Sequence, residues 1–469
     1  MSWTLGVGGI GWAVALGWLG MVHATRADEP APPSPSTTTT TVASLTYAND
    51  IAPIVQAKCQ TCHRTGGVAP FGLTSFAQVK RWSAMIAEVV EQGRMPPWHA
   101  NPAYGSFAND RSLTADQKRT LLSWIEQGCA PGDLDQAPPN PVFPGEWSIG
   151  TPDLVLTMPE PYKIKANGTM PYQWAAIPTG FTEDRWIESI EVKPGNKAVV
   201  HHVLVFVGRP GALRDQGRDP TSRQLGGYVP GDVNIRFPEG VAKKIPAGST
   251  LLLQLHYTPN GKATTDQTSV GLIFAKQPPK YEAKTHGIFQ TRFEIPPHAS
   301  NHEVVKTYRV PADVKLLSLW PHMHLRGKDF RFTFRFPDGR EEILLDVPSY
   351  DFAWQTVYQL KEPRLIPAGT VIECVAHFDN SENNPANPDP NATVRWGEQT
   401  DDEMMIGYLD YLLVRSDDPN PADADANAQV RAELPRNPER RPQIRERLLQ
   451  RLAEGARRRN AEIPAQSPR

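Results

Sequence analysis

Five consecutive residues near the start of the chain, Cys59-Gln60-Thr61-Cys62-His63, have the types and the spacing to do chemistry. Two thiols separated by two residues, with a histidine directly after the second, form the attachment pattern of a c-type haem. Each thiol adds to one vinyl group of the porphyrin, and the next imidazole is then held beneath the iron. The alternative, a redox pair of cysteines, lacks that histidine and normally opens a helix in a βαβ pattern. We therefore predict one covalent haem c per chain, with His63 as an iron ligand.

A second iron ligand should lie downstream of this motif. The segment Gly93-Arg94-Met95-Pro96-Pro97-Trp98 offers the thioether of Met95 on a loop stiffened by two prolines. Coordination by methionine and histidine raises the potential of a haem and is typical of electron-transfer cytochromes. We predict Met95 as the ligand. His99 is the alternative ligand, and Met95 would then only pack against the ring.

The sequence around the motif is patterned as helices. We predict helices over residues 47–56, 76–92 and 114–127, the last with an apolar stripe that includes Leu121 and Trp124. Thr114-Ala-Asp-Gln117 has the sequence of a capping box, which starts a helix. Residues 46–135 thus resemble a small class I cytochrome c, and this resemblance implies an all-α domain.

Histidines in the middle of the chain form a second group that could bind metal. They lie on segments rich in β-branched and apolar residues, for which we predict strands: His201, His202, His256, His322, His324 and His377. His322 and His324 are two residues apart, which on a strand points both imidazoles to one face. Two convergent imidazoles suit Zn, Cu, Fe or Ni. His201 and His202 are neighbours, so they reach one metal only through a twist, a bulge or a strand end.

An internal repeat relates two of these segments. Ile245-Pro-Ala-Gly-Ser249 leads to His256 and Ile366-Pro-Ala-Gly-Thr370 leads to His377, and each histidine follows its glycine by eight residues. We therefore predict two related β-domains in tandem, over residues 146–285 and 286–415. Two such domains favour two metal sites.

Residues 150–415 resemble the copper type II, ascorbate-dependent monooxygenases, which include peptidylglycine alpha-hydroxylating and dopamine beta-monooxygenases. Four motifs carry the resemblance, in the family's order. They are the pair His201-His202, the strand Leu253-Gln-Leu-His-Tyr257, the HxH motif Pro321-His-Met-His-Leu325, and Asp402-Glu-Met404 with Tyr408.

The resemblance implies two mononuclear coppers in two antiparallel, jelly-roll-like β-sandwich domains. His201, His202 and His256 would hold the copper that supplies electrons. His322, His324 and Met404 would hold the copper that binds O₂, with Tyr408 in the same site. Imidazoles suit copper, and a soft thioether favours Cu(I). His377 has no ligand counterpart in the family, and we interpret it as a structural relic of the duplication.

Departures from the family concern the substrate. Peptide-amidating members place an arginine two residues before the first histidine of HxH, and this chain has Trp320 there. The asparagine expected two residues after the methionine ligand is Ile406, and the position after Met404 is Met405, which leaves Cys374 without its disulfide partner. The resemblance therefore indicates a less polar substrate than a peptide ending in glycine.

The composition sets the wider frame. With 469 residues there is room for about three domains. The net charge of −2 gives no indication of nucleic-acid binding, and four cysteines, two of them in the haem motif, imply no disulfide framework. Residues 1–27 are typical of a secretory signal or a membrane anchor, which predicts a periplasmic or otherwise extracytoplasmic protein. Residues 28–45 form a Pro/Thr-rich linker, and residues 416–469 a charged tail with an Arg-rich helical stretch over 442–459.

Taken together, these patterns predict a copper-dependent monooxygenase that hydroxylates a C–H bond of a small or apolar organic substrate with O₂. The fused haem would feed electrons to the coppers from ascorbate or a redox protein, at high effective concentration. The join at residues 131–146 is rich in proline and so semi-rigid, which favours a set approach of the haem to the first copper domain. The alternative is a non-catalytic haem–copper electron carrier or copper-binding protein.

Overall fold

A computed structural model describes residues 44–143, 145–209, 223–229 and 234–414. The predicted signal or anchor, nearly all of the Pro/Thr-rich linker and the charged tail with its helix lie outside the described residues. Within the part of the chain that is described, no helix has both the length and the hydropathy needed to span a membrane.

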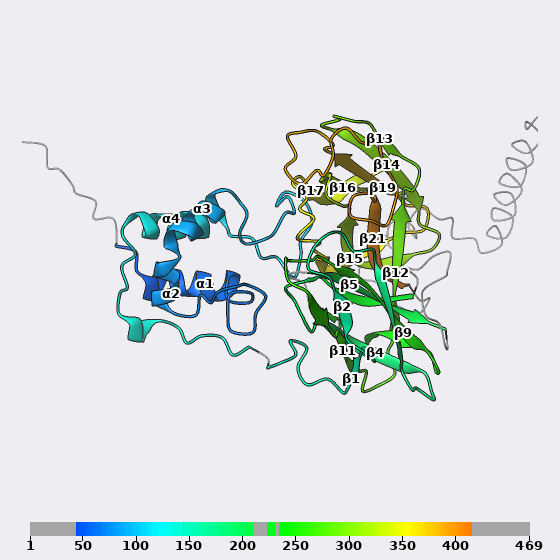
Figure 1. Ribbon diagram of the computed structural model, residues 1–469, viewed down its shortest axis with the longest axis horizontal. Helices are drawn as coiled ribbons and strands as arrows, with labels where there is room; N and C mark the ends of the chain where they lie inside the picture. Colours follow the sequence, from blue (N-terminus) through cyan, green and yellow to red (C-terminus); the bar gives the residue numbers. More distant parts are fainter. Residues whose placement is uncertain (1–43, 144, 210–222, 230–233, 415–469) are drawn as a thin grey trace, which may run out of the picture. The chain divides into compact units, whose positions relative to one another are not determined.

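Residues 45–137 form a helical segment with its own core (Figure 1). Its elements are η1 (Tyr47–Ile51), α1 (Ala52–Lys58), α2 (Phe76–Arg81), α3 (Ser83–Glu91), α4 (Ala115–Glu126) and η2 (Leu134–Gln136). The predicted apolar stripe of α4 is buried, with Leu121 at 1% and Trp124 at 0% exposure, and it packs on Ile51 and Val79. The helices thus enclose a small hydrophobic core behind the Cys59–His63 motif.

One predicted helix start is confirmed, and one predicted helix is divided in two. The capping box at Thr114 is confirmed, because its side chain accepts from the Gln117 N–H while the Gln117 side chain accepts from the Thr114 N–H. The single helix predicted over 76–92 is wrong. The backbone leaves the helical region at Trp82, whose ring stacks on Phe71 at 4.3 Å. A tertiary contact here outweighs local helix propensity.

The rest of the described chain is β-sheet. The strands of the first half are β1 (Leu154–Thr157), β2 (Tyr162–Ile164), β3 (Gln173–Pro178), β4 (Arg185–Lys193), β5 (Val200–Gly208), β6 (Gln224–Tyr228), β7 (Asn234–Arg236), β8 (Val241–Ile245), β9 (Thr250–Tyr257), β10 (Thr264–Asp266) and β11 (Ser269–Phe274). Those of the second half are β12 (Tyr281–Phe289), β13 (Glu294–Ile295), β14 (His302–Arg309), β15 (Val314–His322), β16 (Gly327–Arg335), β17 (Glu341–Val347), β18 (Tyr358–Ile366), β19 (Val371–Phe378), β20 (Val394–Arg395) and β21 (Ile406–Leu413).

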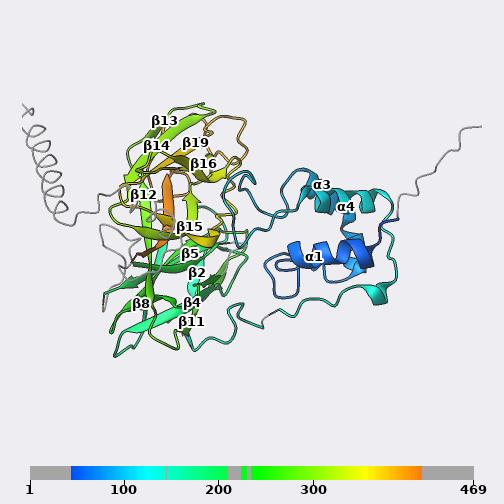
Figure 2. The same cartoon turned by 180° about the vertical axis from the view of Figure 1, so that it is seen from behind.

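These strands build two sandwiches around two cores (Figure 2). A nine-stranded sheet has the order β1-β11-β4-β8-β12-β21-β15-β18, with β7 beside β4, and two four-stranded sheets have the orders β3-β9-β5-β6 and β14-β19-β16-β17. The first core joins β4, β5, β9 and β11, and the second joins β15, β16, β19 and β21. Alternation is plain on β16, where Phe330, Phe332 and Phe334 are all fully buried. The predicted β-sandwich architecture is confirmed.

One strand spans the predicted domain boundary at residue 285. β12 pairs in parallel with β8 of the first half and antiparallel with β21 of the second, so the nine-stranded sheet is continuous. A buried polar group spans the same place. The Lys243 ammonium lies 3.5 Å from the Asp410 carboxylate, which also accepts from the hydroxyls of Thr285 and Ser318. The two sandwiches therefore share both a sheet and a buried ion pair.

Residues 98–110, here called the strap, belong to the helical segment by sequence but pack on the second sandwich. Asn101 donates its N–H to the Asp346 carbonyl at 2.8 Å, and its side-chain amide donates to the Asp346 carboxylate. Ala108 donates to the Gln359 carbonyl, and Phe107 forms a bridge with Leu360. The Phe107 ring is 9% exposed and belongs to the second core.

The proline-rich join returns along the helical segment before it enters the first sandwich. The side chain of Gln56 donates to the Pro138 carbonyl at 2.8 Å, and Asn140 donates to the Thr74 carbonyl at 2.8 Å. At the far end, the Glu191 carboxylate accepts from the N–H groups of Ser148 and Ile149. Hydrogen bonds thus hold the middle of the join to the helical segment and the residues directly after the join to the first sandwich.

Candidate functional site

Three histidines of the first sandwich form one cluster. His201 and His202 lie at the start of β5 and His256 lies opposite them on β9, with ring centroids 4.9 to 5.4 Å apart. The strand register shifts between Val200 and His202 where β5 pairs with β9. This irregularity is the bulge that two adjacent histidines need to face one point. Sequence analysis left bulge, twist and strand end open, and the structure shows the bulge.

The nitrogens of this cluster are placed as ligands of one ion would be. The Nδ1 atoms of His201 and His202 lie 3.2 Å apart. Two nitrogens on one tetrahedral metal, each about 2.0 Å from it, would be about 3.3 Å apart. His256 Nε2 contacts the Thr400 hydroxyl at 2.9 Å, while its buried Nδ1 has no hydrogen-bond partner. The ligand atoms of all three side chains lie within 4.8 Å of one another. The cluster fits a metal ion.

Burial keeps these imidazoles neutral. Desolvation lowers the pKa of His201 to about 4, partly offset by the Asp351 carboxylate, and lowers the pKa of His256 to about 3, with His201 as a further cause. The pKa of His202 is also well below its ordinary value, first through burial and then through the neighbouring histidines. Neutral imidazole is the form that binds metal, so the cluster is ready for an ion at neutral pH.

The HxH motif places two more imidazoles together. β15 ends at His322, and His324 follows in the loop, which differs from the predicted arrangement of both on one strand. Their rings are nonetheless 5.3 Å apart. His322 Nδ1 contacts the Gln355 side-chain oxygen at 2.7 Å, and His324 Nδ1 contacts the Asp402 carbonyl at 3.2 Å. Because an oxygen acceptor holds each Nδ1–H, both Nε2 lone pairs remain for a ligand, and His324 Nε2 is buried without a partner.

A buried carboxylate joins HxH to the segment of Met404. Glu403 is fully buried and accepts from the N–H groups of His324 at 2.8 Å, Arg326 at 2.6 Å and Met404 at 3.3 Å. Desolvation raises the pKa of Glu403 to about 8. The two motifs thus share one carboxylate, although some 80 residues separate them in sequence.

Met404 lies outside the main core and beside an aromatic cluster. It precedes β21 and packs with Trp320, Ile406 and Tyr408, whereas its neighbour Met405 is buried in the second core. Trp320 lies opposite Tyr408 in the pairing of β15 with β21, at 4.5 Å between ring centroids. Trp320 and Ile406 therefore belong to a buried aromatic cluster, in which the Tyr408 ring lies 6.3 Å from the His322 ring.

The two histidine groups are close to one another. His256 of the first group contacts Thr400, which lies in the loop before Met404. The Phe352 ring stacks on His201 at 4.6 Å and 21°, and it meets His324 edge-on at 5.7 Å and 71°. Burial first, and the charge of His201 among other causes, lowers the pKa of His322 to about 4.

The haem motif closes the end of α1. His63 Nδ1 contacts the Phe71 carbonyl at 3.2 Å, so this nitrogen carries the proton and Nε2 keeps its lone pair. The Leu73 N–H donates to the His63 carbonyl, which fixes the same loop from the other side. A proximal histidine is oriented in this way by its second nitrogen. The contacts of His63 therefore fit the role of a haem ligand.

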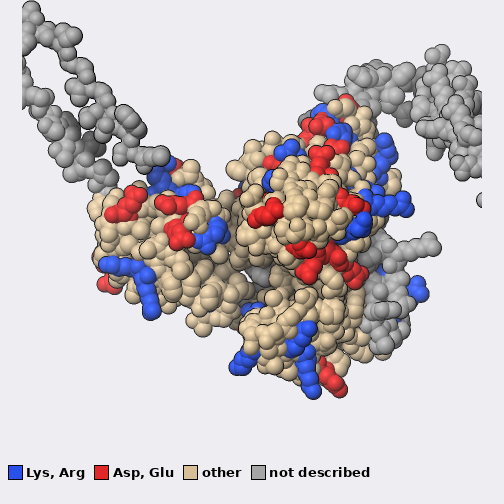
Figure 3. All heavy atoms as spheres, turned by 45° about the horizontal axis from the view of Figure 1, so that its top comes forward, with Lys and Arg blue, Asp and Glu red and all other residues tan. Residues whose placement is uncertain are grey.

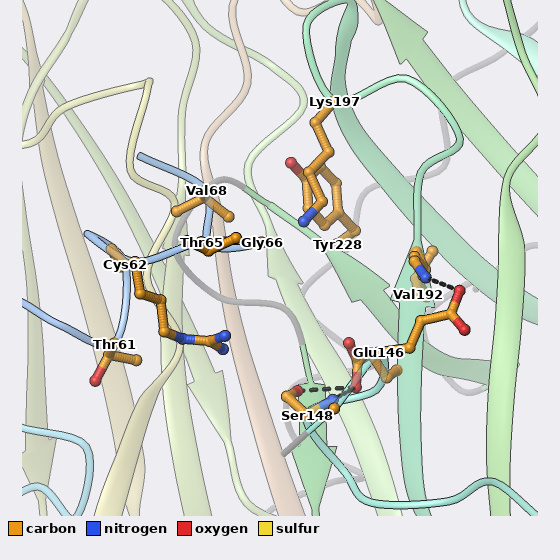
Figure 4. Close-up of a pocket in the computed structure, with 15 residues that line it drawn as sticks. Thr61, Cys62, Thr65, Gly66, Val68, Glu146, Ser148, Val192, Lys197 and Tyr228 are labelled. Carbon is orange, nitrogen blue, oxygen red and sulfur yellow. Dashed lines mark hydrogen bonds and ion pairs between the residues drawn. The ribbon is translucent and has the colours of Figure 1, made fainter. Parts of the chain in front are cut away.

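Open space adjoins this motif. A cavity of about 300 Å³ is lined by Cys62 and Arg64 of the helical segment and by Lys193, Lys197 and Tyr228 of the first sandwich (Figure 4). Met95 is half-buried and donates its N–H to the Val89 carbonyl, at the end of α3. His99, the alternative ligand, lies four residues on, inside the strap.

His377 occupies the repeat-related position of His256 but has different neighbours. β9 and β19 are both eight residues long, and each histidine is the seventh. His377 Nδ1 lies 2.7 Å from the Asp329 carboxylate, and its Nε2 lies 3.5 Å from that of Glu303. It therefore contacts two carboxylates of the second sandwich, whereas His256 lies among other histidines.

Three residues around the candidate site were missed by sequence reasoning. Phe352 and Gln355 lie on the loop between β17 and β18, which has no motif that points to a metal site. Glu403 lies inside the Asp402–Met404 motif. The sequence therefore placed it near the candidate site but did not predict its hydrogen bonds to the HxH segment.

Charged side chains of both signs occur on one face of the molecule. On the face in Figure 3, a group of acidic side chains gathers near the middle of the larger part, basic side chains are scattered, and large areas carry neither. This distribution agrees with the net charge of −2 and gives no basic footprint on that face.

Comparisons with known proteins complete the description. No model of a known protein family matches the chain, and no curated protein matches it. Among solved structures, the chain is similar to the major capsid protein P2 of bacteriophage PM2, with 10% identity and a TM-score of 0.27 over 56% of this chain and 98% of that chain. It is also similar to a structure of Broad Bean Stain Virus (7% identity, TM-score 0.23, 53% and 91% covered) and to allantoicase (12% identity, TM-score 0.14, 47% and 81% covered). These TM-scores are too low to carry an argument about function.

Proposed function

We propose that this chain is a copper-dependent monooxygenase that hydroxylates a C–H bond with O₂ and receives its electrons through a covalently attached haem. The observation that carries the proposal is the orientation of the buried imidazoles. His256 Nδ1 and His324 Nε2 are buried nitrogens without partners, each on a ring whose other nitrogen is held. An unpaired buried nitrogen is costly unless a ligand satisfies it.

The two groups differ in donor set. His201, His202 and His256 offer three nitrogens, while His322, His324 and Met404 offer two nitrogens and a thioether. Copper suits both sets, and the thioether favours Cu(I) at the second. Copper held there would supply one-electron redox chemistry and an open position for O₂.

The chain's own residues prepare the second site. Gln355 and the Asp402 carbonyl fix which nitrogen of His322 and His324 is free. Glu403 holds the HxH backbone next to Met404 through three N–H groups. Trp320 and Tyr408 exclude water from the adjoining surface, since each is only 7% exposed. The side chains of Trp320 and Tyr408 favour an uncharged, largely apolar substrate.

The electron supply completes the proposal. Hydroxylation uses one O₂, two electrons and two protons from the solvent and releases one water, and a haem passes one electron at a time. We assign attachment to Cys59 and Cys62 and iron ligation to His63 and Met95, within a cytochrome c-like helical domain. The free Nε2 of His63 supports this assignment.

Metal analysis of matched variants tests the copper sites. The purified full chain should bind two coppers and consume O₂ during a substrate screen once it is reduced. His256→Ala should lower the copper content to one per chain. His377→Ala removes the repeat-related histidine and should leave both coppers in place. Zinc at both sites in the presence of copper would contradict the scheme.

Two further outcomes separate this function from its alternative. Haem should stay on the polypeptide after extraction with acid acetone, and release of the haem would contradict the covalent attachment. His322→Ala should abolish O₂ consumption that depends on substrate. A wild-type protein that binds both coppers and haem, yet never consumes O₂ with any substrate, would be a haem–copper electron carrier.

A further inference from the structure

Phe352 occupies a place that no motif predicts. It belongs to the second sandwich, on the loop between β17 and β18, yet its ring stacks face to face on His201 of the first sandwich. Its edge meets His324 of the HxH motif. A single aromatic side chain thus contacts a candidate ligand from each of the two metal groups.

The same ring lines a large cavity that reaches the helical segment. This cavity, of about 870 Å³, is bounded by His201 and Phe352 on one side. On the other side lie Gly93 and Arg94, which directly precede Met95, together with Trp98 and His99. The loop of the predicted haem ligand and the first metal group therefore open onto one space, and Phe352 forms part of its wall.

The strap attaches the residues on one side of this cavity to the second sandwich. Trp98, three residues after Met95, packs its ring on Tyr358 at 5.0 Å and on Phe107 at 5.9 Å. Backbone bonds from Asn101 and Ala108 to the second sandwich hold the following residues. The residues that follow Met95 and the loop that carries Phe352 thus both pack on the second sandwich.

We propose that Phe352 is the positioning residue for electron transfer from the helical segment to the first metal group, an inference that rests on the proposed function. A haem held by Cys59, Cys62 and His63 would supply one electron and pass from ferrous to ferric, and one Cu²⁺ held by His201, His202 and His256 would accept that electron and become Cu⁺. No bond forms or breaks. Phe352 fills the gap in front of His201 with a polarisable ring, which shortens the distance through empty space or water.

Flash photoreduction of the haem under anaerobic conditions tests this role. The haem absorbance reports the electron as it leaves, and the loss of the Cu²⁺ signal in electron paramagnetic resonance reports its arrival. The variants are Phe352→Leu, Phe352→Tyr as the aromatic rescue, and Phe293→Leu as a matched control. Phe293 also lies in the second sandwich, where it stacks on Phe378 at 5.7 Å.

In the wild type, haem re-oxidation should depend on copper. In Phe352→Leu it should slow severalfold, because the aromatic ring that stacks on His201 is then missing. Phe352→Tyr and Phe293→Leu should keep the wild-type rate, and copper content should be unchanged in all of them.

The outcomes distinguish failure of the role of Phe352 from failure of the proposed function. If wild-type haem passes no electron to copper, the proposed electron supply fails. If the wild type does so and Phe352→Leu is equally fast, the function stands and the role of Phe352 is overturned. Equal slowing in Phe352→Leu and Phe352→Tyr would also overturn it, since an aromatic ring would then not suffice.

Discussion

At the scale of single residues, histidines of this chain differ in what their second nitrogen contacts. His63 and His324 each donate from Nδ1 to a backbone carbonyl, and His322 donates to a side-chain amide. Each is left with Nε2 as its ligand atom. Both ring nitrogens of His377 lie near carboxylates, so neither nitrogen is left as a ligand atom. The contacts of the ring, more than its place on a strand, separate a candidate ligand from a structural histidine.

The low pKa values of the buried histidines predict how stability depends on pH. The folded pKa of His201, His256, His322 and His324 is about 3 to 4, below the value near 6.5 of an unfolded chain. Between about pH 4 and 6.5 the unfolded state therefore binds more protons, and the free energy of unfolding rises with pH. Urea denaturation of the metal-free protein should show stability falling from pH 7 to pH 5. His256→Asn should make that fall shallower, and stability that is flat or rises on acidification would contradict the reasoning.

The bond from His322 to Gln355 predicts a specific loss at the second metal group. Gln355→Leu should weaken copper binding there by about tenfold to a hundredfold, because an orienting partner of a metal-binding histidine contributes about that much. Gln359→Leu is the matched control, since only its backbone makes hydrogen bonds to other segments. Competition titration with a copper chelator measures the copper affinity of both variants. Equal affinities for the two variants would show that Gln355 does not orient His322.

At the scale of secondary-structure elements, some helices and strands could be predicted from the sequence and other features could not. Runs rich in β-branched and apolar residues predicted strands at the six singled-out histidines, and five of the six lie on strands, because burial within a sheet imposes a local pattern. The Thr114 helix start was equally local. Three features depend on partners that are remote in sequence: the helix break at Trp82, the packing of the strap and the position of Phe352. The spacing of residues in the sequence therefore could not predict them. The same limit applies to the acceptors Phe71 and Gln355.

The strap predicts a long-range effect of a single substitution. Phe107→Ala should destabilise the second sandwich by about 3 kcal/mol, the usual cost of removing a buried phenylalanine ring. Hydrogen exchange followed by mass spectrometry should show faster exchange in β17 and β18. Phe76→Ala, in the core of the helical segment, should speed exchange in the helices and leave β17 and β18 unchanged. Unaltered exchange of β17 and β18 in Phe107→Ala would mean that the strap is only a surface contact.

At the scale of the whole molecule, three parts of the chain are interleaved. The two sandwiches share the nine-stranded sheet through β8 and β12 and share the buried pair of Lys243 and Asp410. The helical segment contributes Phe107 to the second core. Each of the two sandwiches that carry the candidate metal groups thus shares core, sheet or ion-pair contacts with another part of the chain.

The strap also has a consequence for the order in which the protein can be made. Asn101 and Asn109 meet partners 245 and 248 residues further along the chain. At about 5 to 20 residues per second, a ribosome needs about 12 to 50 s to synthesise that stretch. During this time Trp98 and Phe107 have no core to enter, although the helices around them can already form. The newborn chain therefore carries an exposed aromatic pair until β17 and β18 emerge, and any chain cut short before residue 341 keeps that pair exposed permanently.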